Sequence, residues 1–173
     1  MRPILTTLAA LTLALTATPG VTAVTRVPDI SATQASSHTD AELRNLAAVQ
    51  TAFDAWRAGT GGPFDLLAED AVWTITGRSD AAGTYEGKAA FIDRVIAPFN
   101  ARMIAGIRPT IRSIHVDGDT VIIFFDASGM AHDGLPYDNT YAWFMTFSGD
   151  RVIRVSAFYD SLAFNALWRR VQP

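Results

Sequence analysis

Two alternating runs near the C-terminus give the clearest pattern of hydrophobic and polar positions in this chain. Residues 137–147 carry a large side chain at nearly every second position, and residues 151–160 alternate again after a Ser148-Gly149-Asp150 turn. Successive side chains of a strand point to opposite faces, so the first run predicts a strand with one bulky face. The two runs and their turn together predict a β-hairpin that covers a core or a cavity.

Other segments show the spacing of helices or of further strands. Thr39 and Glu42 have capping-box spacing ahead of a helical pattern that Gly59 ends, and Pro98 is expected to bend or end a later helix. The predicted helices cover residues 39–58, 63–68, 91–99 and 161–171. The predicted strands cover residues 71–77, 84–87, 107–116, 120–129, 137–147 and 151–159. Helices set against one face of a curved antiparallel sheet predict an α+β fold, a cone that encloses an apolar pocket.

The start of the chain has a different composition. A positive start, an apolar run as far as Ala17 and small or compact residues at 21–23 are typical of a secretory signal that is cleaved after Ala23. A membrane anchor is the alternative, but the apolar run is shorter than the ~20 residues that span a bilayer. Residues 24–38 have the composition of a flexible linker. We therefore expect an exported, periplasmic or extracellular chain with one domain over residues 39–173 and no membrane association after cleavage.

Charge and cysteine content exclude several classes of function. The chain carries 14 Lys and Arg against 17 Asp and Glu, with a net charge of −3 and no cysteine. Nucleic-acid binders normally show a basic face, so no nucleic-acid partner is expected. The sequence has no cysteine and no histidine pair at ligand spacing, so no metal is expected. No glycine-rich phosphate loop follows a predicted strand, so no cofactor is expected either.

Side-chain parity selects the residues that face the interior. In the first hairpin strand the bulky face consists of Asn139, Tyr141, Trp143, Met145 and Phe147. In the second strand the apolar face consists of Ile153, Val155, Ala157 and Tyr159. The polar tips of Asn139, Tyr141 and Tyr159 either bond to neighbouring backbone and water or bind a ligand oxygen. Asp160 falls on the opposite face, which favours a helix-capping role over catalysis.

One histidine is a candidate for acid–base chemistry. His132 lies in a loop next to Asp133, and such a pair could supply a titratable group if substrate reached it. Loop pairs of this kind are more often solvated.

The order of the elements, with several short segments, resembles the SnoaL-like branch of the nuclear transport factor 2-like superfamily. Its members include ketosteroid isomerases, limonene epoxide hydrolases and polyketide cyclases. The resemblance extends over about residues 39–162. The matching segments are residues 53–59, 73–77, 83–88, 117–119, 137–141 and 158–160. This fold carries many unrelated activities, so the resemblance predicts the fold more firmly than the function.

The resemblance also implies where catalytic residues would stand. The counterparts of the ketosteroid isomerase tyrosine and two aspartates are Ala52, Ile75 and Trp143. The counterparts of the epoxide hydrolase arginine and aspartates are Phe125, Ala127 and Ala157, and the last-strand acid of polyketide cyclases also matches Ala157. Apolar residues therefore occupy positions that are polar in the enzymes.

Three functions remain open. The first is an exported module that binds a small hydrophobic molecule. Its expected pocket residues are Phe53, Trp56, Trp73, Ile75, Phe125, Ala127, Asn139, Tyr141, Trp143, Ala157 and Tyr159. The second is an isomerase, cyclase or dehydratase that uses Tyr141, Tyr159 or His132 on a small apolar substrate. The third is an interaction domain that forms a homodimer through Phe144 and Phe158 on the outer sheet face.

Overall fold

The computed structural model describes residues 38–172. The expected signal at residues 1–23 lies outside the described residues, as does the expected linker apart from His38, so both stay predictions. Within the described part of the chain, no helix is long and apolar enough to cross a membrane.

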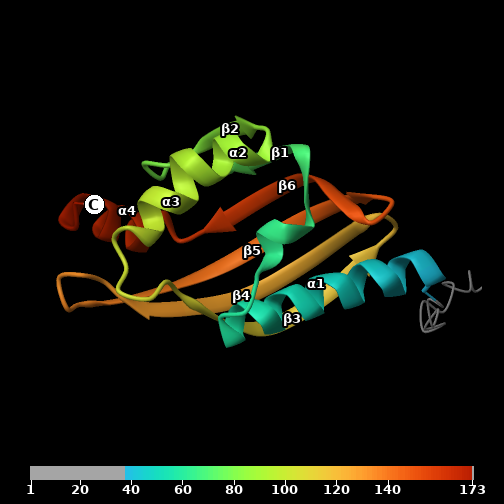
Figure 1. Ribbon diagram of the computed structural model, residues 1–173, viewed down its shortest axis with the longest axis horizontal. Coiled ribbons are helices and arrows are strands. Elements are labelled where there is room, and N and C mark those ends of the chain that lie inside the picture. Colours follow the sequence, from blue (N-terminus) through green and yellow to red (C-terminus); the bar gives the residue numbers. More distant parts are fainter. Residues whose placement is uncertain (1–37, 173) are drawn as a thin grey trace, which may run out of the picture. The chain divides into compact units, whose positions relative to one another are not determined.

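One six-stranded sheet forms the body of the domain (Figure 1). Its strands are β1 (Leu67–Ile75), β2 (Gly83–Glu86), β3 (Arg108–Asp117), β4 (Thr120–Met130), β5 (Pro136–Ser148) and β6 (Arg151–Tyr159). They lie in the order β2-β1-β6-β5-β4-β3, and neighbours are antiparallel except for the parallel pair β1 and β6. A parallel pair needs a long crossover, which the helices and strands between β1 and β6 provide.

Helices cover the inner face of this curved sheet, as the α+β prediction requires. They are α1 (Asp40–Ala58), the 3-10 turn η1 (Pro63–Leu66), α2 (Lys88–Phe91), the π-helical η2 (Ile92–Ile96), α3 (Ala97–Asn100) and α4 (Ser161–Arg170). Helix α1 contacts β3 and β4, α2 contacts β1 and β2, and α4 contacts β5. In Figure 1 the α2–α3 helix and α1 lie toward opposite edges of the sheet, with β5 and β6 between them in this view.

Both predicted helix caps are present. Thr39 Oγ1 accepts a bond from the Glu42 amide at 3.2 Å, and a Glu42 carboxylate oxygen accepts one from the Thr39 amide at 2.7 Å. Gly59 ends α1 at a φ of 75°, a left-handed conformation that suits glycine. Asp160 Oδ1 accepts bonds from the amides of Leu162 and Ala163 at 2.8 and 3.4 Å, which confirms its role as the cap of α4.

Pro98 does not end its helix. Residues 92–96 form a π-helical turn in which the Ala97 amide bonds to the Ile92 carbonyl, and the helix continues to Asn100. Proline has no amide hydrogen for the regular bond to the preceding turn. The helix therefore widens just before Pro98 and continues beyond it.

The hairpin confirms most of the parity prediction. All five odd-numbered residues from Asn139 to Phe147 are buried. In β6, however, Val152 pairs with Phe147 and Arg154 pairs with Thr146, so Ile153 is the extra residue of a β-bulge. Ile153 is therefore 39% exposed and Val152 is fully buried, and the predicted inward orientation of Ile153 is wrong.

Candidate functional site

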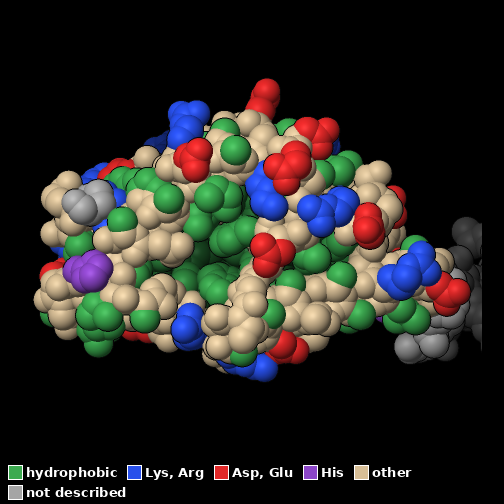
Figure 2. All heavy atoms as spheres, viewed as in Figure 1, with side chains coloured by type: hydrophobic (Ala, Val, Ile, Leu, Met, Phe, Trp, Pro, Cys, Tyr) green, Lys and Arg blue, Asp and Glu red, His purple; other side chains and the backbone are tan. Residues whose placement is uncertain are grey.

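A cavity of about 100 Å³ lies between the sheet and the helices. Figure 2 shows it as a hollow lined with hydrophobic side chains. Aromatic residues dominate its wall: Trp56, Phe64, Trp73, Phe91, Phe99, Tyr141, Trp143, Tyr159 and Phe164. The other lining residues are Ile75, Val95, Ile96, Asn100, Ile107 and Ala157. These residues come from all the helical segments as well as from β1, β5 and β6, so the fold as a whole builds the cavity.

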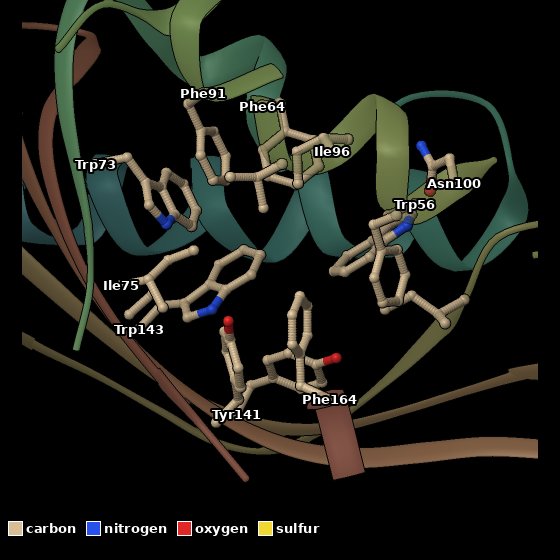
Figure 3. A pocket seen from close by; sticks show the side chains of 15 residues that line it. Trp56, Phe64, Trp73, Ile75, Phe91, Ile96, Asn100, Tyr141, Trp143 and Phe164 are labelled. Atoms are coloured by element: carbon tan, nitrogen blue, oxygen red, sulfur yellow. The ribbon is translucent and has the colours of Figure 1, made fainter. Parts of the chain in front are cut away.

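The aromatic rings of the wall hold one another in fixed orientations. Trp73 stacks on Phe91 with ring centroids 4.1 Å apart and an interplanar angle of 10°. Trp143 meets Trp73 nearly edge-on, at 5.0 Å and 84°, and stacks on Trp56 at 6.0 Å and 15°. Figure 3 shows these side chains converging on one space between the sheet and the helical wall. Such a wall presents flat faces and ring edges to a ligand.

Seven of the eleven expected pocket residues line the cavity. They are Trp56, Trp73, Ile75, Tyr141, Trp143, Ala157 and Tyr159. Ala157 pairs with Ile75 in β1 and with Trp143 in β5, so three positions equated with catalytic residues meet in the pocket. Their side chains are apolar, which leaves those positions without acid–base chemistry.

The other four expected residues are buried behind the cavity wall. Phe53 and Phe125 pack edge to face with centroids 4.8 Å apart and fill the space under α1. Ala127 and Asn139 pair with each other across β4 and β5 and are almost fully buried. These residues share the inner face of the sheet but belong to the core.

Most of the lining residues that the sequence prediction missed come from the helices, and Ile107 lies just before β3. Phe64, Val95, Ile96, Phe99, Asn100, Ile107 and Phe164 line the cavity, together with Phe91. The spacing from Phe91 to Phe99 does predict an apolar helix face. It carries no information about whether that face meets a packed core or an open cavity.

His132 lies away from the pocket. Its side chain is exposed, and Asp133 forms an ion pair with Arg170 at 3.0 Å and accepts a bond from the Leu135 amide. The loop therefore fastens the end of α4 to the start of β5. Among the tentative catalytic residues, only Tyr141 and Tyr159 reach the cavity.

A hydrogen-bonded chain runs behind the pocket wall. Asn139 Nδ2 donates to the Tyr137 hydroxyl at 2.9 Å and to the Asp160 carbonyl at 3.0 Å. Asn139 Oδ1 accepts from the amides of Thr140 and Asp160. The hydroxyls of Tyr137 and Tyr141 lie 2.7 Å apart. Asn139 thus bonds to neighbouring backbone and joins β5 to the start of α4.

The buried tyrosines in and behind the pocket wall are uncharged at neutral pH. Burial raises the pKa of Tyr141 well above its usual value, and burial raises the pKa of Tyr137 to about 12 despite its hydrogen bonds with Tyr141 and Asn139. Burial also raises the pKa of Tyr159, whose hydroxyl lies 2.8 Å from Ser79 Oγ. The hydroxyls of the two lining tyrosines, Tyr141 and Tyr159, can therefore form hydrogen bonds with a ligand, but they are poor bases.

No acidic or basic side chain belongs to the described lining of the pocket. Within residues 38–172, no group of three or more His, Cys, Asp or Glu side chains is placed to hold a metal ion. The arrangement is suited to a neutral, apolar molecule.

A profile described as the SnoaL-like domain matches residues 49–155. The chain belongs to the SnoaL-like domain family. A search of curated proteins finds no match for it.

Solved structures support the fold of this SnoaL-like domain. Bal32a from a soil-derived mobile gene cassette is 21% identical, with a TM-score of 0.64, over 75% of this chain and 100% of that one. A putative SnoaL-like polyketide cyclase from Jannaschia sp. CCS1 is 17% identical, with a TM-score of 0.63, over 77% and 96%. TerC, co-crystallised with polyporic acid, is 20% identical, with a TM-score of 0.59, over 73% and 98%. These likenesses establish the nuclear transport factor 2-like fold.

Proposed function

We propose that this SnoaL-like domain binds a small, neutral, hydrophobic molecule with a flat ring. The observation that carries the proposal is a cavity lined by aromatic side chains and by no charged one. Ligand sites in proteins are typically apolar concavities with a few polar groups that fix orientation, and here the hydroxyls of Tyr141 and Tyr159 are those groups. TerC, a structurally similar protein, was co-crystallised with polyporic acid, which gives further support for a small-molecule ligand.

The size of the cavity limits what it can enclose. A cavity of roughly 150 Å³ lined by apolar side chains binds benzene, and the cavity here measures about 100 Å³. The enclosed part of the ligand is therefore no larger than about one ring. The rest of a larger ligand would extend past Asn100, the exposed member of the lining.

Intrinsic fluorescence tests the proposal, because Trp56, Trp73 and Trp143 all line the pocket. We expect saturable changes in emission when the domain is titrated with terpenes, aromatic polyketides or lipids. The variant Trp168→Phe provides a control, since Trp168 packs against Phe164 outside the lining and its loss leaves the response in place. No response to any member of the panel would contradict the proposal.

An isomerase, cyclase or dehydratase is the second candidate. Two hydroxyls reach the pocket, and a preorganised hydroxyl can stabilise an oxyanion that forms on a substrate. No carboxylate or imidazole of the described residues lines the cavity to act as a base, so the proposal gives binding precedence over turnover. Chromatography of each bound ligand after long incubation with the domain distinguishes the two, because only an enzyme changes the ligand.

A specific observation also supports self-association. Phe124, Phe144, Ile153 and Phe158 are each more than a third exposed, and Phe144 and Phe158 pack edge to face at 6.0 Å on the outer side of β5 and β6. The contact between Phe144 and Phe158 makes an exposed apolar patch, and such patches mark interaction sites. We propose that two copies of the chain cover this outer face, which sedimentation at several protein concentrations would detect.

A further inference from the structure

The hydrogen bonds behind the pocket wall determine which polar groups remain for a ligand. Asn139 has no unused capacity, because both hydrogens of its amide nitrogen are donated and its oxygen accepts two bonds. It must therefore act as a donor toward the Tyr137 hydroxyl. That hydroxyl keeps one hydrogen of its own to donate.

The hydrogen of Tyr137 has a single recorded acceptor among the described residues, which is the hydroxyl oxygen of Tyr141 at 2.7 Å. If Tyr141 donated instead, the buried hydrogen of Tyr137 would have no partner, at the free-energy penalty of an unsatisfied donor. The chain therefore runs from Asn139 to Tyr137 to Tyr141. The hydroxyl hydrogen of Tyr141 is left over, on a side chain that lines the cavity.

Other groups at or behind the wall also have a hydrogen left to donate. The hydroxyls of Ser79 and Tyr159 hold two hydrogens between them and share one hydrogen bond, so one hydrogen is left over. The indole nitrogen of Trp73 is buried and has no hydrogen-bond partner, and an indole N–H can only donate. The side-chain amide in the described lining belongs to Asn100, which is exposed rather than enclosed.

We infer that the enclosed end of the ligand carries a hydrogen-bond acceptor without a hydrogen of its own, such as a ketone or quinone oxygen, which binds the hydroxyl of Tyr141. This inference rests on the proposed binding function and specifies the ligand class. An alcohol in the same place would have a hydrogen of its own that needs a buried acceptor. Apart from the exposed Asn100, the side chains of the described lining offer only the remaining lone pairs of the Tyr141 and Tyr159 oxygens, whereas a ketone needs no such partner. A carboxylate would enter a cavity with no basic side chain, and burial of an unpaired charge is unfavourable.

Four probes of matched size test the inference, since each is one benzene ring with a small substituent. Acetophenone carries an acceptor, cumene has no polar group, 1-phenylethanol has a donor and an acceptor, and benzoate is charged. Affinities are measured by two-dimensional NMR titration of the folded domain and of two variants. Tyr141→Phe removes the proposed donor. Tyr85→Phe is the control, because the Tyr85 hydroxyl is buried on the Ala81 carbonyl outside the pocket lining.

We expect acetophenone to bind about three- to tenfold more tightly than cumene, as one net hydrogen bond allows. We expect Tyr141→Phe to remove this difference in affinity and to change the affinity for cumene by no more than about twofold. Tyr85→Phe is expected to preserve the difference between acetophenone and cumene. The cumene measurement separates loss of the donor from any general loosening of the pocket.

The outcomes distinguish the two proposals. If cumene and acetophenone bind equally, or if Tyr141→Phe weakens both alike, the assignment of an acceptor ligand is wrong while binding itself stands. Tighter binding of 1-phenylethanol or benzoate than of acetophenone also overturns the assignment. If no probe binds the unmodified domain, the proposed function and the inference fall together.

Discussion

At the scale of single residues, the alternation of β5 predicts which side chains face inward but not how deep they lie. Tyr141 and Asn139 share one face of the strand, yet Tyr141 lines the cavity and Asn139 bonds to backbone behind it. Depth depends on what the opposite layer supplies. Phe53 of α1 fills the space over Phe125, whereas no comparable side chain fills the space over Ala157. That difference depends on contacts between segments that are distant in the sequence. The alternation of side chains along one strand does not predict such contacts.

Asp160 provides a test of a capping role against a catalytic one. Asp160→Ala removes the side-chain acceptor at the start of α4, and we expect a loss of about 1 kcal/mol in the free energy of unfolding. Asp160→Ser keeps a side-chain acceptor at the cap, so we expect this variant to retain most of the free energy of unfolding. Urea denaturation measures both variants. A loss of ligand turnover or affinity in Asp160→Ser, with stability intact, would contradict the capping assignment.

The buried tyrosines predict a stability that declines at high pH. The pKa of Tyr137 is raised to about 12 in the folded domain, whereas an unfolded tyrosine titrates near 10. Between these values the unfolded chain loses a proton that the folded domain keeps, so stability falls as the pH rises. Denaturant midpoints from pH 9 to 11 measure the decline. Tyr137→Phe is expected to make the decline less steep without abolishing it, because Tyr141 and Tyr159 also have raised pKa values. An unchanged slope in that variant would show that Tyr137 is not responsible.

At the scale of elements, the sequence predicts the type and order of nearly every helix and strand. The boundaries that differ are those set by partners elsewhere in the chain. Strand β1 begins at Leu67, not at residue 71, because Leu67 pairs with Val152 of the distant β6. The bulge at Ile153 arises in the same place, where the pairing of β5 and β6 shifts. Local periodicity cannot show such a shift.

The segment before β3 passes close to Gly129 of β4. This close contact predicts that a single added methyl group destabilises the domain. A Cβ added at Gly129 would lie 2.6 Å from the Gly106 carbonyl oxygen and 2.8 Å from the Met103 methyl. We expect Gly129→Ala to destabilise the domain by about 1–3 kcal/mol, since this backbone must shift. Ser128→Ala, one residue away on the exposed side, is expected to change the unfolding free energy little. Equal stability of the two variants would refute the close approach.

At the scale of the whole molecule, the fold leaves one sheet face inside, around the pocket, and the other face outside with an apolar patch. The inner face agrees with the predicted apolar cone. The outer face exposes the two phenylalanines, Phe144 and Phe158, on which the predicted homodimer depends. The sequence predicts both faces through parity, but neither the ligand nor the partner follows from a pattern that only separates inside from outside.

The outer face predicts how self-association responds to charge. Phe144→Lys places a charge in the centre of the proposed contact, so we expect the dimer to dissociate at concentrations where the unmodified domain associates. Leu162→Lys is the control, because Leu162 is 82% exposed on α4 and lies outside this patch. Sedimentation velocity measures both. Dissociation by Leu162→Lys alone would place the contact on α4 instead.

Ligand binding in the aromatic cavity beside Ala157 is tested most directly by comparing two variants, Ala157→Leu and Ala89→Leu. Each is titrated with a ligand that binds the unmodified domain. Both variants add the same atoms, but Ala157 lines the cavity and Ala89 is exposed on α2. We expect Ala157→Leu to lower the affinity at least tenfold while it stays folded, and Ala89→Leu to leave the affinity unchanged. Unchanged affinity in a folded Ala157→Leu would contradict binding in this cavity.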